Sequence, residues 1–142
     1  MRGAYWAASG VKPDVAIAVD VTFASDYPGV DHKDSGKVKL GCGPVICHGS
    51  ITNPKVVDLL KVCAKEKNLP YQVEAYMGST HTDADKMHFS GTGVVTALLS
   101  LPLRYMHSPS EVCQLDDIRT SIELLAQFLC SIDEHTDLDP FH

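Results

Sequence analysis

The fold is decided by one apolar stretch near the amino terminus, Val15–Val21, which reads Val-Ala-Ile-Ala-Val-Asp-Val. It is rich in β-branched residues and lies between Pro13 and the polar segment Ser25–Gly29. A run of this kind is typical of a central strand in a parallel sheet, because helices cover both faces of such a sheet. We therefore predict a central strand here, with one charged residue, Asp20, close to its end.

Helical and extended patterns alternate along the rest of the chain. Asn53-Pro54 predicts a helix start, because Asn accepts hydrogen bonds from free first-turn amides and Pro suits the first helical position. Val94–Leu101 has the strongest strand pattern, and Leu115–Ile132 carries apolar residues along one face of a terminal helix. The other predicted elements are extended stretches at Lys37–Leu40 and Pro44–Cys47, an end of the first helix near Asn68, a strand over Tyr71–Tyr76 and a short helix over Thr82–Phe89.

This alternation predicts an α/β fold with a mainly parallel sheet flanked by helices, since parallel strands need crossover connections that helices supply. We expect one domain over residues 1–142, because typical domains have about 100 to 150 residues and no linker or repeat divides the chain. With 44% apolar and 21% charged residues, the composition is that of a globular protein with a real core.

Charge and hydropathy exclude several classes of partner. The formal net charge is −6, which leaves no excess positive charge for nucleic acid. The longest apolar run, Val94–Leu103, is interrupted by polar residues and is far shorter than the roughly 20 residues that a membrane span needs. No apolar segment of secretory length begins the chain, and its 5 cysteines form no Cys-x-x-Cys pair. We therefore predict a cytoplasmic protein with reduced thiols.

Two polar positions lie where ligands of open α/β sheets gather, beyond the carboxyl ends of the strands. Asp20 lies near the end of the first strand, and Arg104–His107 follows the last one. An ionised carboxylate in an apolar strand needs a partner, because its burial alone costs several kcal/mol. Asp20 is accordingly either an ion-pair partner of Arg104 or a loop cap, or a metal ligand. His107 is either a metal ligand or an ordinary surface or core histidine, since no compact ligand cluster surrounds it.

The other histidines and the cysteines carry weaker signals. His81 and His88 flank Asp83–Asp85, where a helix cap explains the carboxylates better than a metal site does. His48 follows Cys47 without a second ligand pair, so a zinc site that uses Cys42 and Cys47 is a minor alternative. His32, His135 and His142 lie in polar stretches and are expected to be solvated.

Six short motifs occur in order along the chain and together carry a specific resemblance. They are Ile17-Ala-Val-Asp-Val-Thr22, Asp26-Tyr-Pro-Gly29, Gly41-Cys-Gly-Pro44, Asn53-Pro-Lys55, Thr82-Asp-Ala84 and Arg104-Tyr-Met-His-Ser-Pro109. In this order they resemble the carboxyl-terminal part of the cocatalytic two-metal aminopeptidases. That family includes glutamyl and deblocking aminopeptidases and the tetrahedral TET particles, and some members carry the names endoglucanase or cellulase. The resemblance extends from Arg2 to about Ile132.

The resemblance implies a three-layer α/β peptidase domain of the phosphorylase/hydrolase-like fold that lacks its amino-terminal part. In this family the cleft holds two divalent ions, usually zinc or cobalt, and the substrate is a peptide. Asp20 corresponds to the aspartate that binds one ion, and His107 to the histidine that binds the other. Asp83 corresponds to an aspartate in a loop near the cleft, and His81 stands where many relatives carry glycine. We expect Asp83, His81 and Arg104 to line or support the substrate pocket.

The main departure from the family lies at the amino terminus. Arg2-Gly3-Ala4 corresponds to the tail of the motif Glu-Glu-x-Gly-x-Arg-Gly-Ala, so the general-base glutamate is expected upstream of Met1. A second glutamate, a histidine and a bridging aspartate that bind metal in the family, and its inserted dimerisation domain, are likewise absent here. Because one ligand to each ion cannot hold a two-metal centre, we expect the chain alone to be inactive.

Two kinds of partner follow from this expectation: a complementary amino-terminal fragment, or further copies in a homo-oligomer. The alternative to an enzyme is a non-catalytic truncated relative that acts as a binding or assembly module. If strands are missing from the sheet, Val15–Val21 or a neighbouring strand presents an uncovered edge and an apolar face. Such an edge favours self-association or strand addition.

Overall fold

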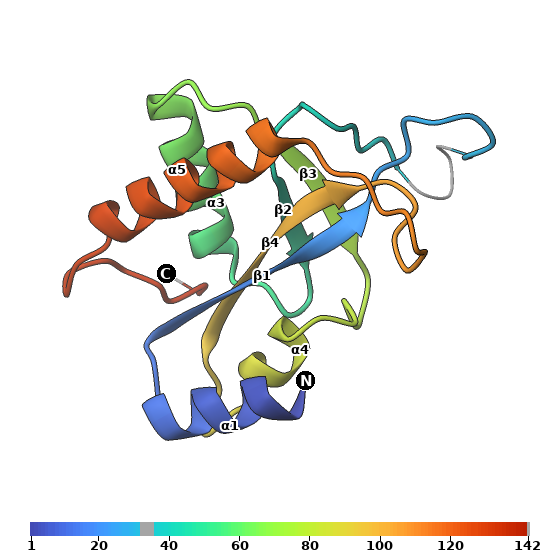
Figure 1. Cartoon of the computed structure of the whole chain (residues 1–142). Coiled ribbons are helices and arrows are strands. Elements are labelled where there is room, and N and C mark those ends of the chain that lie inside the picture. Colours follow the sequence, from blue (N-terminus) through green and yellow to red (C-terminus); the bar gives the residue numbers. More distant parts are fainter. Residues whose placement is uncertain (32–35, 142) are drawn as a thin grey trace.

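The computed structural model describes residues 1–31 and 36–141 (Figure 1). The prediction that His32 and His142 are solvated concerns residues outside the described ones. The helices are α1 (Arg2–Val11), α3 (Pro54–Glu66), α4 (Ala84–His88) and α5 (Leu115–Ser131). The strands are β1 (Val15–Phe23), β2 (Val45–Gly49), β3 (Gln72–Tyr76) and β4 (Val95–Leu103). Within these residues, every helix falls short of the length and hydropathy that a bilayer crossing requires.

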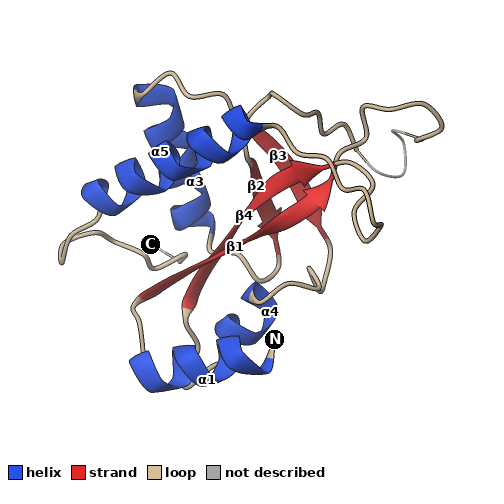
Figure 2. Ribbon diagram, in the orientation of Figure 1, coloured by secondary structure: helices blue, strands red, loops and turns tan. Residues whose placement is uncertain are grey.

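The elements form three layers, with the sheet in the middle (Figures 1 and 2). Helices α3 and α5 cover one face, where Leu60, Leu124 and Phe128 pack against strand residues such as Ile46 and Leu99. The other face is covered in part by α4, whose Ala84 joins a smaller cluster with residues of β1, β2 and β4, and α1 packs against α4. The three-layer α/β architecture is therefore confirmed.

The sheet is mixed, although two of its three pairings are parallel. Its strand order is β1-β4-β2-β3. Strands β1 and β4 run parallel, as do β2 and β3, but β4 meets β2 in an antiparallel pairing at Val45 with Ser100 and Ile46 with Leu99. Strands β1 and β4 consequently run in one direction, and β2 and β3 run in the opposite direction.

The prediction that Val15–Val21 forms a central strand is wrong in its position, although the strand exists. Strand β1 lies at the edge of the sheet, and Val19 and Phe23 are 54% and 50% exposed. The uncovered edge that was expected of this segment or a neighbour is thus present in β1. A continuous run of apolar residues shows that a strand is suited to burial. It does not show how many strands pair with it, so it could not tell a central strand from an edge strand.

Local signals located most helix and strand ends correctly. Asn53 caps α3, because its Oδ1 accepts hydrogen bonds from the backbone N–H groups of Lys55 and Val56 at 2.9 and 3.2 Å. Three expectations are corrected. Residues 37–40 join no strand, α1 carries no signal that was recognised, and Asp83 makes no capping hydrogen bond at α4. The Oγ1 of Thr82 accepts from the Ala84 N–H instead, at 3.3 Å.

A tight turn delivers the chain into β2 and is held by one buried carboxylate. Asp117, which is 1% exposed in α5, accepts hydrogen bonds from the N–H groups of Gly41 and Gly43, both at 2.8 Å. Gly43 has a φ of 85°, and a Cβ placed on it would overlap the carbonyl oxygen of Pro70. Both the backbone conformation and the close approach to the segment before β3 therefore require glycine at this position.

We predict that Gly43→Ala lowers the free energy of unfolding by about 3 kcal/mol, because it combines a strained φ with a backbone clash. Chemical denaturation followed by circular dichroism measures the change. Gly3→Ala is the matched control, since a Cβ there meets nothing within 4 Å and lies in a helix. The control should be neutral or slightly stabilising. Equal stability of the two variants would contradict this account of the turn.

Candidate functional site

The parallel pairing of β1 with β4 brings two distant segments to the same end of the sheet. Phe23 and Leu103 are partners in the register, and the N–H of Ala24 donates to the carbonyl oxygen of Leu103 at 2.9 Å. Beyond the strands, the rings of Tyr27 and Tyr105 lie 5.2 Å apart. The end of the Asp20 strand and the Arg104–His107 segment are therefore neighbours, as the sequence prediction requires.

Asp20 lies three residues before the end of β1 and is partly exposed. By strand alternation it shares a face with Ala18, which packs in the smaller core cluster beside Cys47 and Leu98. Its Oδ1 accepts a hydrogen bond from the N–H of Val21 at 2.8 Å. Within residues 1–31 and 36–141 it forms no ion pair. The interpretation of Asp20 as the ion-pair partner of Arg104 is therefore wrong.

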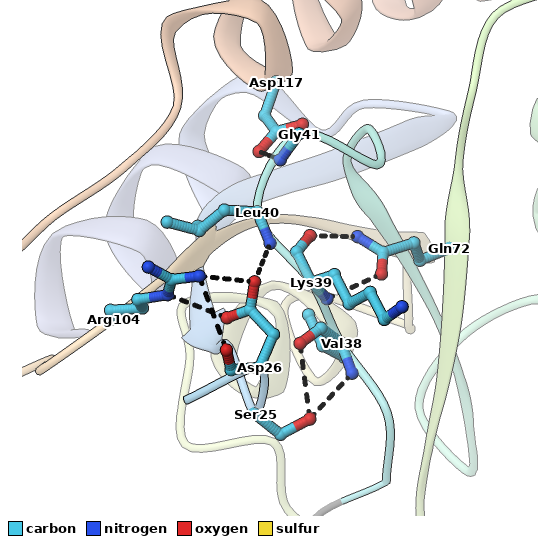
Figure 3. A network of polar contacts seen from close by, with 9 residues as sticks. All are labelled: Ser25, Asp26, Val38, Lys39, Leu40, Gly41, Gln72, Arg104 and Asp117. Atoms are coloured by element: carbon cyan, nitrogen blue, oxygen red, sulfur yellow. Dashed lines mark hydrogen bonds and ion pairs between the residues drawn. The ribbon is translucent and has the colours of Figure 1, made fainter. Parts of the chain in front are cut away.

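Arg104 pairs with a different carboxylate, that of Asp26 (Figure 3). Its Nε donates to Oδ1 at 2.8 Å and its Nη2 to Oδ2 at 2.7 Å, while the Leu40 N–H also donates to Oδ2, at 3.1 Å. The hydrogen bond from Arg104 is the main reason that the pKa of Asp26 is lowered, against the opposing effect of burial. This bidentate pair ties the start of the β1–β2 connection to the end of β4.

The same connection is held at further points along its described part. The Oγ of Ser25 accepts from the Val38 N–H at 2.9 Å. The side chain of Gln72 accepts from the Lys39 N–H at 2.8 Å and donates to the Lys39 carbonyl at 2.9 Å, as Figure 3 shows. Side-chain hydrogen bonds therefore hold residues 37–40 in place. These residues have the sequence pattern of an extended segment, but they form no backbone ladder with a strand.

His107 lies in the turn after β4 and is exposed. Its ring meets the Phe23 ring edge-on, with centroids 6.3 Å apart. The backbone N–H of His107 donates to Glu111 Oε1 at 2.7 Å. Tyr105 and His107 have φ values of 58° and 65°, a conformation that is uncommon for residues other than glycine. The turn thus holds the imidazole against the end of β1 in a strained backbone, which is a feature often found at functional sites.

Asp83 and His81 lie in the loop that follows β3 and leads into α4. Both are exposed, and His81 has a φ of 60°. Glycine adopts this conformation more freely than histidine does. The loop is organised by Asp85, whose carboxylate accepts from the hydroxyl groups of Ser79 and Thr80 and from the N–H groups of Thr80 and His81.

Asp85 makes a pH prediction possible. Burial by itself would raise the pKa of this carboxyl, but the bonds from Ser79, Thr80 and His81 outweigh it and lower the pKa. A lowered pKa stabilises the fold above the unfolded value of about 3.9, and this contribution is lost as the pH falls through the folded value. We expect Asp85→Asn to cost about 1–3 kcal/mol at pH 7. Urea denaturation should show that the difference in free energy of unfolding between wild type and Asp85→Asn shrinks below about pH 4. A difference that does not depend on pH would contradict this role of the Asp85 carboxylate.

A polar cluster that the sequence analysis missed lies on the same face as Asp20. The Oγ1 of Thr22 donates to Glu74 Oε2 at 2.7 Å. Burial raises the pKa values of Glu74 and of the neighbouring Tyr76, and raises that of the Cys47 thiol to about 12. The only sequence signal was the acidic residue within the Tyr71–Tyr76 strand. A neutral, fully buried Cys47 gives no support to a zinc–thiolate site.

The described residues contain no group of three or more His, Cys, Asp or Glu side chains that could hold a metal ion. A carboxylate and an imidazole suit zinc or cobalt as donor types, but a two-metal centre needs more donors than Asp20 and His107. The residues that the structure describes therefore do not by themselves fit a complete two-metal site.

Comparison with known proteins decides the family. A family model described as M42 glutamyl aminopeptidase matches residues 1–124. The chain belongs to this family. The lysyl aminopeptidase of Pyrococcus furiosus is 40% identical over 131 residues, which cover 91% of this chain and 36% of that protein.

Solved structures agree with the M42 assignment. The aminopeptidase APDkam598 from the archaeon Desulfurococcus kamchatkensis matches with a TM-score of 0.78 and 39% identity, over 89% of this chain and 36% of that one. A TET aminopeptidase from Thaumarchaeota archaeon SCGC AB-539-E09 matches with a TM-score of 0.86 and 28% identity, over 94% of this chain and 37% of that one. The chain thus spans less than two fifths of the length of the curated M42 relatives that it matches.

Proposed function

We propose that this chain is the carboxyl-terminal portion of the catalytic domain of a metal-dependent aminopeptidase, which removes amino-terminal residues from peptides. The observation that carries the proposal is the match of residues 1–124 to the M42 family. The geometry supports it, because the two segments proposed to bind metal leave β1 and β4 side by side. We also propose a cytoplasmic location, supported by the free thiols of all five cysteines.

Asp20 and His107 are the proposed metal ligands of this chain, each serving one of two divalent ions, zinc or cobalt. Such ions activate water and polarise the peptide carbonyl when they are bound. Asp20 suits this role because, among residues 1–31 and 36–141, its carboxylate accepts one hydrogen bond, from the Val21 N–H to Oδ1, which leaves Oδ2 for a ligand. The remaining donors and the general-base glutamate would come from the part of M42 proteins that this chain does not span. The chain alone is therefore proposed to be inactive.

The other predicted site residues receive supporting roles in this proposal. Arg104 acts through its ion pair with Asp26, which holds the start of the β1–β2 connection against the end of β4. His81 and Asp83 are exposed in the loop after β3 and are proposed to border the substrate pocket. The peptide substrate itself is inferred from the aminopeptidase names of the relatives.

We predict that mixing the chain with the amino-terminal portion of an M42 relative, in the presence of Zn²⁺ or Co²⁺, produces hydrolysis of aminoacyl-p-nitroanilides. Asp20→Asn and His107→Ala should each lower that activity and the bound metal about 100-fold or more, because each removes a proposed ligand. Asp14→Asn and His135→Ala are matched controls on exposed residues away from this end of the sheet. Activity that survives both ligand substitutions would overturn the assignment.

A second candidate function is an assembly module without catalysis. It is favoured by the free edge of β1 and by the exposure of Val19 and Phe23 beside it. Solved relatives include one described as a dodecamer and one that assembles into a tetrahedron or a large octahedral shell. We include a homo-oligomer in the proposal on this ground.

The oligomer proposal predicts that the isolated chain self-associates in sedimentation velocity at micromolar concentration. Val19→Lys should weaken the association, because a lysine on an edge strand opposes further strand pairing. Lys is already tolerated at exposed positions such as Lys12, so Val11→Lys in α1 is a control of equal charge. A stable monomer at all concentrations, with no binding of dyes for apolar surface, would contradict the prediction.

A further inference from the structure

One side-chain hydrogen bond joins two strands that the sheet itself does not connect. Strands β1 and β3 lie at opposite ends of the strand order, with β4 and β2 between them. Nevertheless the Oγ1 of Thr22 in β1 donates to Oε2 of Glu74 in β3 at 2.7 Å. Thr22 is only 4% exposed. The bond therefore joins the two outer strands directly, on the side of the sheet that α4 partly covers.

Backbone pairing ties this end of β1 to one neighbouring strand. Among the described strands β1 pairs only with β4, in continuous register from Val15 with Val95 to Phe23 with Leu103. The bond from Thr22 to Glu74 adds a contact with a second strand, β3.

Stability alone gives a poor reason for a carboxyl group at position 74. The group is largely removed from water, which raises the pKa of Glu74, and its Oε1 is buried with no hydrogen-bond partner among the described residues. A buried polar atom of this kind costs free energy that an apolar side chain of similar size would not cost. A buried polar atom without a partner is expected where the group that carries it has a function other than stability.

We propose that Glu74 is a positioning residue that acts through Thr22 to fix the end of β1, and hence the direction of the Asp20 carboxylate. Thr22 lies two residues beyond Asp20 and, by strand alternation, on the same face. Movement of the Thr22 backbone would turn Asp20 away from any ion shared with donors on other segments. This inference rests on the proposed role of Asp20 as a metal ligand.

The test measures the order of Asp20 directly, by NMR of the full chain. Side-chain scalar couplings report the rotamer of Asp20, and hydrogen exchange of the Val21 amide reports its bond to Asp20 Oδ1. Thr22→Val removes the hydroxyl group, and we expect averaging of the Asp20 rotamer and faster exchange of Val21, by about five- to tenfold for the loss of one hydrogen bond. Thr22→Ser keeps the hydroxyl donor and Glu74→Gln keeps an oxygen acceptor, so both variants should behave like wild type.

Glu74→Met separates positioning from mere stability. It removes the acceptor of the Thr22 hydroxyl, and the double variant Thr22→Val/Glu74→Met removes both polar groups, so the melting temperature of the double variant should stay equal or rise. Asp20 should become mobile in both variants, as in Thr22→Val. Thr92→Val, at an exposed threonine before β4, is the control for the Thr→Val change itself. If Asp20 keeps one rotamer and Val21 exchanges as in wild type in Glu74→Met, the inference is overturned, whether or not Thr22→Val folds.

A separate arm tests the proposed function on which the inference rests. Titration of the wild-type chain with Co²⁺ should broaden the resonances of residues 19–22, and Asp20→Asn should abolish the broadening. Unchanged broadening in Asp20→Asn would reject Asp20 as a ligand while leaving the mobility results intact. Conversely, Asp20 could keep one rotamer in Glu74→Met while Asp20→Asn abolishes the broadening by Co²⁺. That result would reject only the positioning role of Glu74.

Discussion

The parallel pairing of β1 with β4 is the constraint on which the rest of the structure depends. It joins Val15–Phe23 to Val95–Leu103 in continuous register, although half of the chain lies between them. Every contact at the candidate site follows from it, including the Asp26–Arg104 ion pair and the edge contact between Phe23 and His107. Pairing strands this distant costs chain entropy, which the buried core on the α3/α5 side offsets.

The carboxylates of the protein fall into two groups by how completely they are satisfied. Asp117 and Asp85 accept several N–H or hydroxyl bonds and hold loops, and Asp26 is paired with a guanidinium group. Asp20 and Glu74 each leave an oxygen without a partner among the described residues. Buried structural carboxylates are normally satisfied within the fold, and these two lie on the face of the sheet on which the proposed ligand Asp20 stands.

The edge position of β1 connects the fold to the incompleteness of the site. An edge strand with exposed Val19 and Phe23 offers both backbone hydrogen bonds and apolar area to another segment. The chain spans less than two fifths of the curated M42 relatives. A site with two proposed ligands beside an open sheet edge is consistent with a domain whose remaining donors come from elsewhere.

Short-range features were predictable from the sequence alone. The Asn53-Pro54 start of α3, the apolar face of α5 and the core of β4 depend on capping, helical spacing and side-chain solvation, which are local properties. The motifs around Asp20 and His107 likewise identified the family from short segments. Helix α1 was missed because its sequence lacks both a side-chain cap and a recognised pattern.

What the sequence by itself determined is therefore most of the elements, the family and two proposed ligands, because each depends on residues close together in the chain. Only the tertiary structure decided that β1 lies at an edge, that Arg104 binds Asp26 and not Asp20, and that Thr22 reaches Glu74. Each of these contacts joins segments that are far apart in the sequence. Strand order and direction arise from pairings between distant segments, and no local pattern of residues encodes them.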